Sequence, residues 1–145
     1  MINRGLTLIE TLLVFSLMAI LATGAFISVG GVRNSQALVA SGKNLGIVLE
    51  RARIYSRDGR DDKAWGVAAI NDSGYNLLSG APGSFTVVQS FELSPPTRFE
   101  SPGWNIWFKP VVGDADQAEE IVLVNAKGRL FRVLVSTAGL IELRY

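Results

Sequence analysis

Near its beginning this chain has one continuous run of uncharged, mostly hydrophobic residues. Beyond this run the hydrophobic residues recur periodically. Residues 11–32 contain no charged side chain. Apolar side chains in this run occupy every side of a helix, and a helix that is apolar all round is buried in lipid or in other protein. About 20 such residues are enough for a helix to cross a bilayer. The run therefore predicts a transmembrane helix or a helix in the core of an assembly.

The helical pattern continues beyond Arg33, now on one face only. Apolar positions recur at steps of three, four or seven residues, and a sheet can cover the stripe that they form: Leu38, Leu45, Val48 or Leu49, Ala52 and Tyr55. Asp58-Gly59 is a plausible stop, because glycine readily takes the left-handed conformation that ends a helix. We expect an amphipathic helix over about residues 33–57.

The rest of the chain has the pattern of strands. Asn71-Asp72-Ser73-Gly74 is a strong turn signal between two short apolar runs and predicts a hairpin. Strands are expected at 65–70, 75–78, 85–93, 105–109, 121–124, 130–135 and 140–145. The last three read as a meander with period-two alternation. A long helix followed only by strands is an α+β arrangement, so we expect the helix to pack on an antiparallel β-sheet head, β-rich over about 64–145.

Composition excludes several kinds of chemistry. The 145 residues include no Cys and no His, which removes disulfides, thiolate metal sites and the Ser-His-Asp triad. We therefore expect no enzyme and no cofactor. The 14 basic and 13 acidic residues leave a net charge of +1, so bulk electrostatics predict no strong attraction to nucleic acid or anionic membrane.

Glu10 is out of place at the entrance to the apolar run. A carboxylate in lipid costs a few kcal/mol unless a cation pairs with it. Arg4 is six residues away, so it does not share the helical face of Glu10, and the amine of Met1 is further still. A cleavable secretory signal, with Ala22 to Ala25 as the small residues of its cleavage site, and a plain membrane anchor remain alternatives. Neither accounts for Glu10, which requires a new amine after cleavage or a cation from a partner chain.

The motif Arg4-Gly5-Leu6-Thr7-Leu8-Ile9-Glu10, followed by the apolar run, closely resembles the prepilin signature of type IV pilins and of the pseudopilins of type II secretion. The resemblance implies that residues 1–5 are a leader, which prepilin peptidase removes after Gly5. Leu6 becomes the N-methylated new N-terminus. Glu10 then pairs with the terminal amine of a neighbouring subunit during assembly. Residues 6–32 would be the transmembrane helix that later enters the filament core, and residues 33–145 the globular head.

Departures from the family pattern refine this resemblance. The first mature residue is usually Phe and is Leu6 here. The apolar segment lacks the helix-breaking Pro of many major pilins and has Gly24, Gly30 and Gly31 instead, where we expect the helix to bend or soften in a filament. The absence of Cys also differs from major pilins that close a disulfide loop. These differences favour a pseudopilin or minor pilin.

The head shows a looser similarity to the H-type minor pseudopilin and its minor-pilin relatives. Three short motifs and the strand order carry it: Arg51-Ala52-Arg53, Gly128-Arg129 and Ala138-Gly139-Leu140.

The expected function is that of a structural subunit of a type IV pilus or type II secretion pseudopilus. The resemblance implies other pilin subunits, prepilin peptidase, an inner-membrane assembly platform and membrane lipid as partners. It also implies a single pass through the bacterial inner membrane, with the N-terminus cytoplasmic and the head outside, and then an extracytoplasmic filament. Two alternatives remain: a DNA- or ligand-binding minor pilin of a competence or adhesion filament, and a secreted or membrane-anchored β domain with an ordinary signal sequence.

Two clusters are candidates for ligand binding. Four acids in one loop could offer oxygens to Ca²⁺: Asp114, Asp116, Glu119 and Glu120. Five cations in thirteen residues could follow a phosphate backbone: Arg51, Arg53, Arg57, Arg60 and Lys63. Acids interspersed with these cations, among them Asp58 and Asp61, largely cancel their charge, so we expect a solvated, ion-paired turn. Trp104, Trp107 and Phe108 could stack on bases, but aromatic residues in a strand are more often core.

Overall fold

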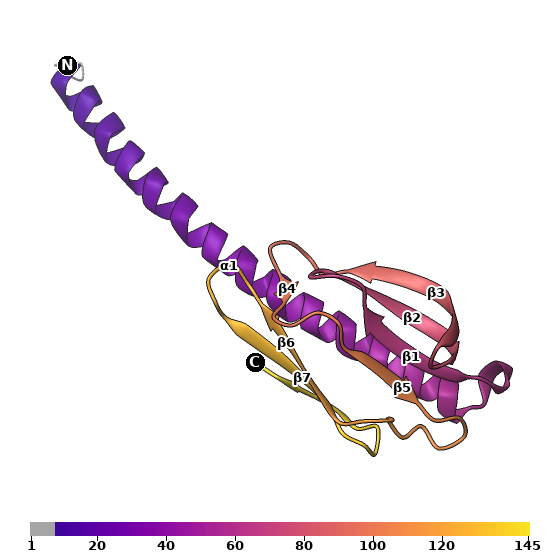
Figure 1. The fold of residues 1–145 in the computed structure, drawn as a ribbon. Coiled ribbons are helices and arrows are strands. Elements are labelled where there is room, and N and C mark those ends of the chain that lie inside the picture. Colours follow the sequence, from indigo (N-terminus) through magenta and orange to yellow (C-terminus); the bar gives the residue numbers. More distant parts are fainter. Residues whose placement is uncertain (1–7) are drawn as a thin grey trace. The chain divides into compact units, whose positions relative to one another are not determined.

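The computed structural model describes residues 8–145, apart from the side chains of residues 24–30. It divides into two units, Met1–Arg33 and Asn34–Tyr145. Helix α1 (Leu8–Arg57) is followed by a short 3₁₀ turn, η1 (Arg60–Asp62), and then only by strands (Figure 1). The α+β class, with a helix packed on antiparallel sheets, is thus confirmed.

The helix ends where the sequence predicts. Gly59 adopts φ 64° and ψ 28°, a left-handed conformation that suits glycine, and the Asp58 amide still donates to the Ile54 carbonyl at 2.9 Å. The N-terminal part of α1 continues through Gly24, Gly30 and Gly31 without a break. The softening expected at these glycines concerns a filament and stays a prediction.

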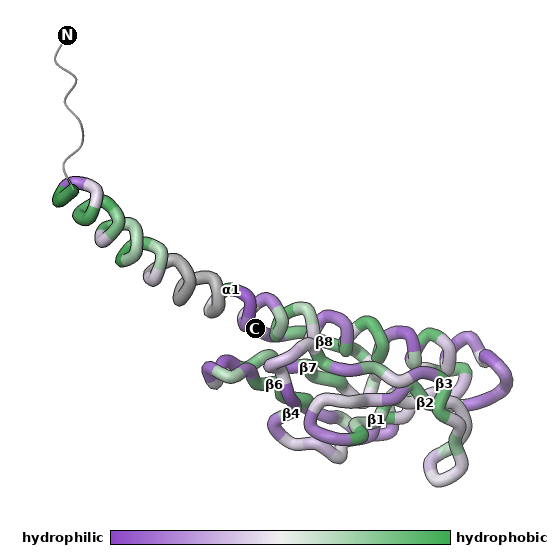
Figure 2. Tube along the Cα trace, turned by 90° about the horizontal axis from the view of Figure 1, so that it is seen from above, coloured by the Kyte–Doolittle hydropathy of each residue, from purple (hydrophilic) through white to green (hydrophobic). Residues whose placement is uncertain are grey.

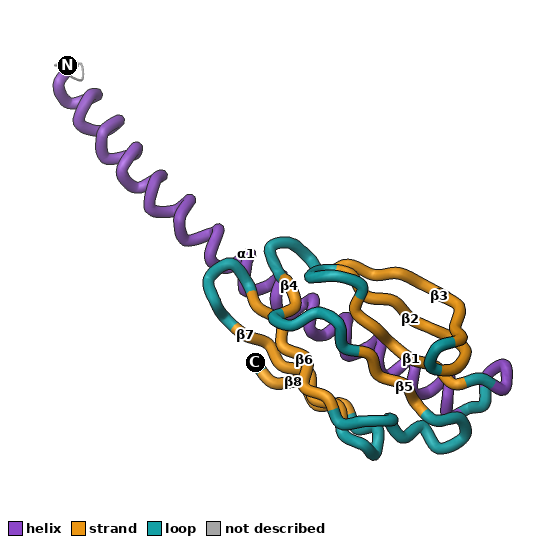
Figure 3. The backbone as a smooth tube through the Cα atoms, viewed as in Figure 1, coloured by secondary structure: helices purple, strands orange, loops and turns teal. Residues whose placement is uncertain are grey.

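The strands form two antiparallel sheets, not one continuous sheet (Figure 3). The first has the order β3-β2-β1-β5 and contains β1 (Ala64–Ala69), β2 (Gly74–Ala81), β3 (Ser84–Glu92) and β5 (Asn105–Phe108). The second has the order β4-β6-β7-β8 and contains β4 (Arg98–Phe99), β6 (Glu119–Val124), β7 (Leu130–Val135) and β8 (Ile141–Arg144). The expectation of a single sheet was wrong in this respect, and β4 was not predicted.

The amphipathic part of α1 is the common core element of the head. Leu38, Leu45, Val48, Leu49 and Ala52 are all buried. Tyr55 packs against the same cluster, which also includes inward-facing residues of both sheets. The stripe read from the sequence is therefore the face that the sheets cover.

Close packing of α1 on the second sheet depends on Gly42. A Cβ placed there would overlap the ring of Phe131 on β7, so the ring occupies the space that any other side chain would fill. Buried polar bonds fix the helix as well: the Ser56 hydroxyl donates to the Phe108 carbonyl at 2.5 Å, and the Ser94 amide donates to the Ser41 hydroxyl at 2.9 Å. These bonds give both serines a structural role.

Candidate assembly surface

The first turns of α1 expose apolar side chains in every direction. Leu8 is 80% exposed, Phe15 70% and Leu21 72%, and apolar residues dominate this part of the helix in Figure 2. The exposed set includes Leu8, Ile9, Leu12, Leu13, Val14, Phe15, Leu17, Met18, Ile20 and Leu21. Soluble proteins rarely expose a large contiguous apolar surface, and such a surface marks an interaction site.

The hydroxyl groups of this segment bind their own helix. Thr11, Ser16 and Thr23 each donate to a backbone carbonyl three or four residues earlier, at 2.8 Å. Local bonds of this kind satisfy a hydroxyl without water. The segment can therefore enter an apolar environment without leaving these donors unpaired.

Glu10 lies exposed in the first turn of α1. Its position suits a carboxylate, because the amino end of a helix carries a partial positive charge. The ion pairs among the described residues do not include Glu10. The sequence places no other charge between Leu8 and Val32. Gly5 and Leu6, the predicted processing residues, lie outside the described part of the chain.

Among the described residues, no helix is both long enough and apolar enough to span a bilayer. The transmembrane role expected for residues 6–32 stays a prediction.

The exposed face of α1 in the head carries two shallow grooves, one on each side of Ile47. One has a volume of about 390 Å³ and is bounded by Lys43, Gly46, Glu50, Ile141 and Leu143 as well as Ile47. The other has a volume of about 310 Å³ and is bounded by Glu50, Arg51, Ile54 and Tyr55 as well as Ile47. Ile47 itself is 57% exposed. The first groove could not be predicted from local patterns, because its far wall comes from β8.

The acidic candidates for Ca²⁺ are engaged separately. The Asp116 carboxylate accepts the Trp107 amide at 3.0 Å, Glu119 accepts the side-chain amide of Gln117 at 3.5 Å, and Glu120 pairs with Arg132 at 3.0 Å. Asp114 belongs to the loop that bonds to β5. Within residues 8–145, no three acidic side chains are grouped so that they could hold a metal ion. Glu119 and Glu120 lie in β6, so the predicted loop ends earlier than expected.

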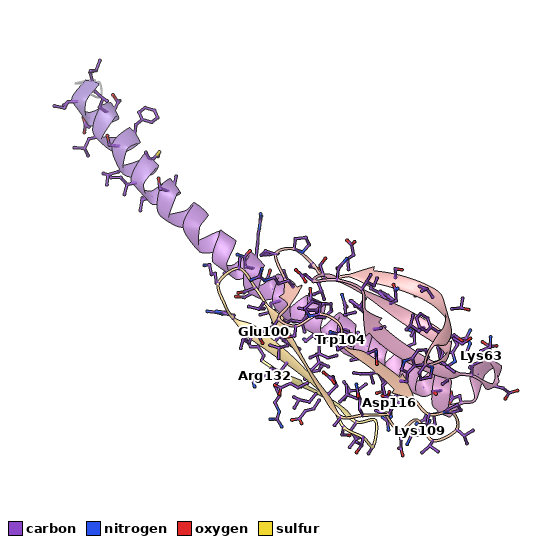
Figure 4. The ribbon with its side chains drawn as sticks, in the orientation of Figure 1. Lys63, Glu100, Trp104, Lys109, Asp116 and Arg132 are labelled. Carbon is purple, nitrogen blue, oxygen red and sulfur yellow. The ribbon has the colours of Figure 1, made fainter. Side chains whose placement is uncertain are left out.

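Four of the five basic candidates for phosphate binding contact polar or aromatic side chains. Three arginines contact neighbouring polar side chains, each at 3.5 Å: Arg51 with Gln89, Arg53 with Glu50 and Arg57 with Asp58. The guanidinium of Arg60 lies 4.3 Å from the centroid of the Tyr55 ring. Lys63 follows η1, in the loop beyond the end of α1 (Figure 4). Two of the five cations thus have an acidic partner, Glu50 or Asp58, and binding of a phosphate backbone by this cluster stays a prediction.

The three aromatic residues considered for base stacking are core residues. Trp104, Trp107 and Phe108 are all buried, and Trp104 packs edge-to-face on Phe99 with 5.3 Å between the ring centroids. The preference for a core role is confirmed.

Comparison of the chain with protein-family models, curated proteins and solved structures finds no match. The motif around Gly5 and Glu10 and the exposed apolar start of α1 are therefore the features that indicate a function.

Proposed function

We propose that this chain is a structural subunit, a minor pseudopilin or minor pilin, of a type II secretion pseudopilus or type IV pilus. The observation that carries the proposal is the apolar, all-round exposed start of α1, with one carboxylate at its entrance. Such a helix requires lipid or other apolar helices around it. An unpaired carboxylate in that environment requires a cation, which the new amine of a neighbouring subunit would supply.

Before assembly, the subunit would cross the inner membrane once, with its N-terminus in the cytoplasm and its head outside. The uncharged run of residues 11–32 has the length for this, and the internally bonded hydroxyls of the segment are compatible with an apolar surrounding. Prepilin peptidase would remove residues 1–5. Assembly would then transfer the helix from lipid to the filament core.

N-terminal mass analysis of the protein from membranes tests the proposal. We expect a mature chain that starts at Leu6 with a methylated amine. We expect no processing of Gly5→Arg, because a large side chain blocks the small subsite that glycine would occupy. A start at Ala25 or Phe26 would indicate an ordinary secretory signal, and an intact Met1 a plain anchor. Either result would overturn the proposal.

A further inference from the structure

The turn between β6 and β7 carries positive charge that no acid in this part of the sequence offsets. Residues 121–141 contain no aspartate and no glutamate. Arg132 of this stretch pairs with Glu120 at 3.0 Å. Lys127 and Arg129 lie in the turn itself and are exposed, and the ion pairs among the described residues include neither of them. The turn therefore presents two cations to its surroundings.

A buried asparagine fixes the shape of this turn. Asn125 is only 4% exposed, and its Oδ1 accepts the backbone amides of Lys127 at 2.9 Å and of Arg129 at 3.0 Å. Gly128 adopts φ 73° between them, a conformation that glycine takes without strain. The backbone that carries the two cations is thus ordered by the fold and needs no ligand to order it.

Arg129 places the turn beside the start of the head's part of α1. Its Nη1 donates to the Ser35 hydroxyl at 3.2 Å and to the Tyr145 hydroxyl at 3.3 Å. Ser35 is the third residue after the uncharged run 11–32, about 4.5 Å further along a helix. Under the proposed function the bilayer ends near the end of this run, so Arg129 lies at the level of the lipid headgroups. The two bonds use Nη1 alone and leave the Nε–Nη2 edge, which can bind a phosphate in a bidentate manner.

The exposed side chains around Arg129 are of the kinds found at a membrane interface. Tyr145 is 67% exposed and Leu130 37%, and the Tyr145 ring packs on Phe131 with 6.2 Å between the centroids. Tyrosine is enriched where a membrane meets water, because its ring is apolar and its hydroxyl polar. Each basic residue near an anionic lipid surface adds about a fivefold preference for that surface. The turn therefore combines aromatic, apolar and basic contacts suited to an anionic bilayer.

A neighbouring groove limits the basic surface to this turn. The groove has a volume of about 360 Å³ and is lined by two acids and one arginine, together with Phe99 and Val124: Asp72, Glu100 and Arg98. A DNA duplex is bound through many phosphate contacts along a track, and two cations beside an acidic groove do not form one. Two cations are enough, however, where a membrane-inserted helix already holds the head close to the lipid phosphates.

We propose that the β6–β7 turn, through Lys127 and Arg129, contacts the phosphate groups of anionic phospholipids in the bilayer that holds α1. This inference rests on the proposed function and adds a lipid-binding surface to the head. The contact would orient the head on the membrane before assembly. Because only two charges carry it, the head can leave the surface when the subunit is taken into a filament.

Contact quenching in vesicles tests this surface with the full-length chain. Since the natural chain contains no cysteine, a dye on Ala126→Cys labels the turn alone. A lipid with a nitroxide on its headgroup quenches the dye only at close approach. We expect stronger quenching in vesicles of phosphatidylcholine mixed with phosphatidylglycerol than in phosphatidylcholine alone. The difference should disappear at about 1 M salt, where the Debye length is about 3 Å.

Lys127→Glu should lower the ratio of docked to undocked heads at least about fivefold in the mixed vesicles. The Lys127 amide holds the turn through its backbone, so the substitution should leave the circular dichroism spectrum unchanged. Lys63→Glu is the matched control, because it makes the same charge change at an exposed residue beyond the far end of α1. It should quench like the wild type.

Three results would contradict the inference. Equal quenching in both kinds of vesicle, with or without Lys127→Glu, would overturn it and leave the proposed function intact. So would binding of a DNA duplex that Lys127→Glu abolishes while phosphatidylglycerol has no effect, since the turn would then serve nucleic acid. A chain that alkaline carbonate extracts from the vesicles would overturn both, because α1 would not be inserted in the bilayer.

Discussion

Gly42→Ala is a sharp test of how α1 packs on the second sheet. A Cβ at Gly42 would overlap ring atoms Cδ1 and Cε1 of Phe131 and lie 2.8 Å from Cγ. The ring cannot turn away into solvent, because Phe131 is only 3% exposed. The substitution therefore forces either the ring or the helix to move.

Gly46→Ala is the matched control, because it makes the same change one turn later. Its Cβ would meet Leu143 Cδ2 at 3.0 Å, and this leucine is 41% exposed and able to move. Both variants gain about 1 kcal/mol from the higher helix propensity of alanine. Overpacking in a closed core costs about 1–3 kcal/mol, and only Gly42→Ala incurs it. The gain is common to both, so the two variants should differ in unfolding free energy by about 1–3 kcal/mol.

Thermal unfolding followed by circular dichroism measures this difference. For a chain of this size, 1 kcal/mol corresponds to about 2–4 °C in Tm, so Gly42→Ala should melt several degrees below Gly46→Ala. We expect Gly46→Ala to melt at or slightly above the wild-type Tm. If Gly42→Ala were as stable as Gly46→Ala, the ring of Phe131 would not lie against Gly42, and the described packing would be incorrect.

Three further predictions concern the head. Ser56→Ala should lower the unfolding free energy by about 1–3 kcal/mol, since it leaves the buried Phe108 carbonyl without this donor; urea titration measures the loss. A chain that starts at Asn34 should be a folded, soluble monomer, because it retains the whole second unit; an unfolded spectrum would refute this. Burial raises the pKa of Tyr75 to about 12, so the free energy of unfolding should fall between about pH 10 and 12 as the unfolded chain deprotonates first. Tyr75→Phe should remove this part of the pH dependence, and an unchanged profile would contradict it.

Local patterns in the sequence predicted the helix and most strands correctly. The buried stripe from Leu38 to Ala52 follows from helical periodicity, because apolar residues on one face of a helix recur every three or four positions. The turn at Asn71 follows from side-chain chemistry: its Oδ1 accepts the amides of Ser73 at 2.9 Å and of Gly74 at 2.6 Å. In each case the residues that carry the signal are close to one another in the sequence.

Features that depend on distant residues could not be predicted in the same way. Alternation tells which face of a strand is buried, but it does not tell which strand is the neighbour, so the division into two sheets was missed. The two-residue strand β4 is too short to show any period. The groove beside Ile47 requires β8 to lie next to α1, and only the fold reveals this. Glu10, in contrast, could be singled out as a candidate from the sequence alone, because a charge interrupts an otherwise apolar context, and its role in assembly stays a prediction.

Under the proposed function, substitution of Glu10 should separate membrane insertion from assembly. Glu10→Ala should leave insertion and cleavage after Gly5 intact, because neither step requires the acid. It should reduce incorporation into filaments, since the partner's amine is then buried without a counter-charge, a loss of about 3–5 kcal/mol where a buried pair is broken. Glu10→Gln should be nearly as harmful, because the amide preserves the shape but not the charge. Immunoblots of membranes and sheared filaments measure both steps. Wild-type incorporation of the Ala variant would show that Glu10 has no role in assembly and would favour a position at a filament tip, where this pairing is unnecessary.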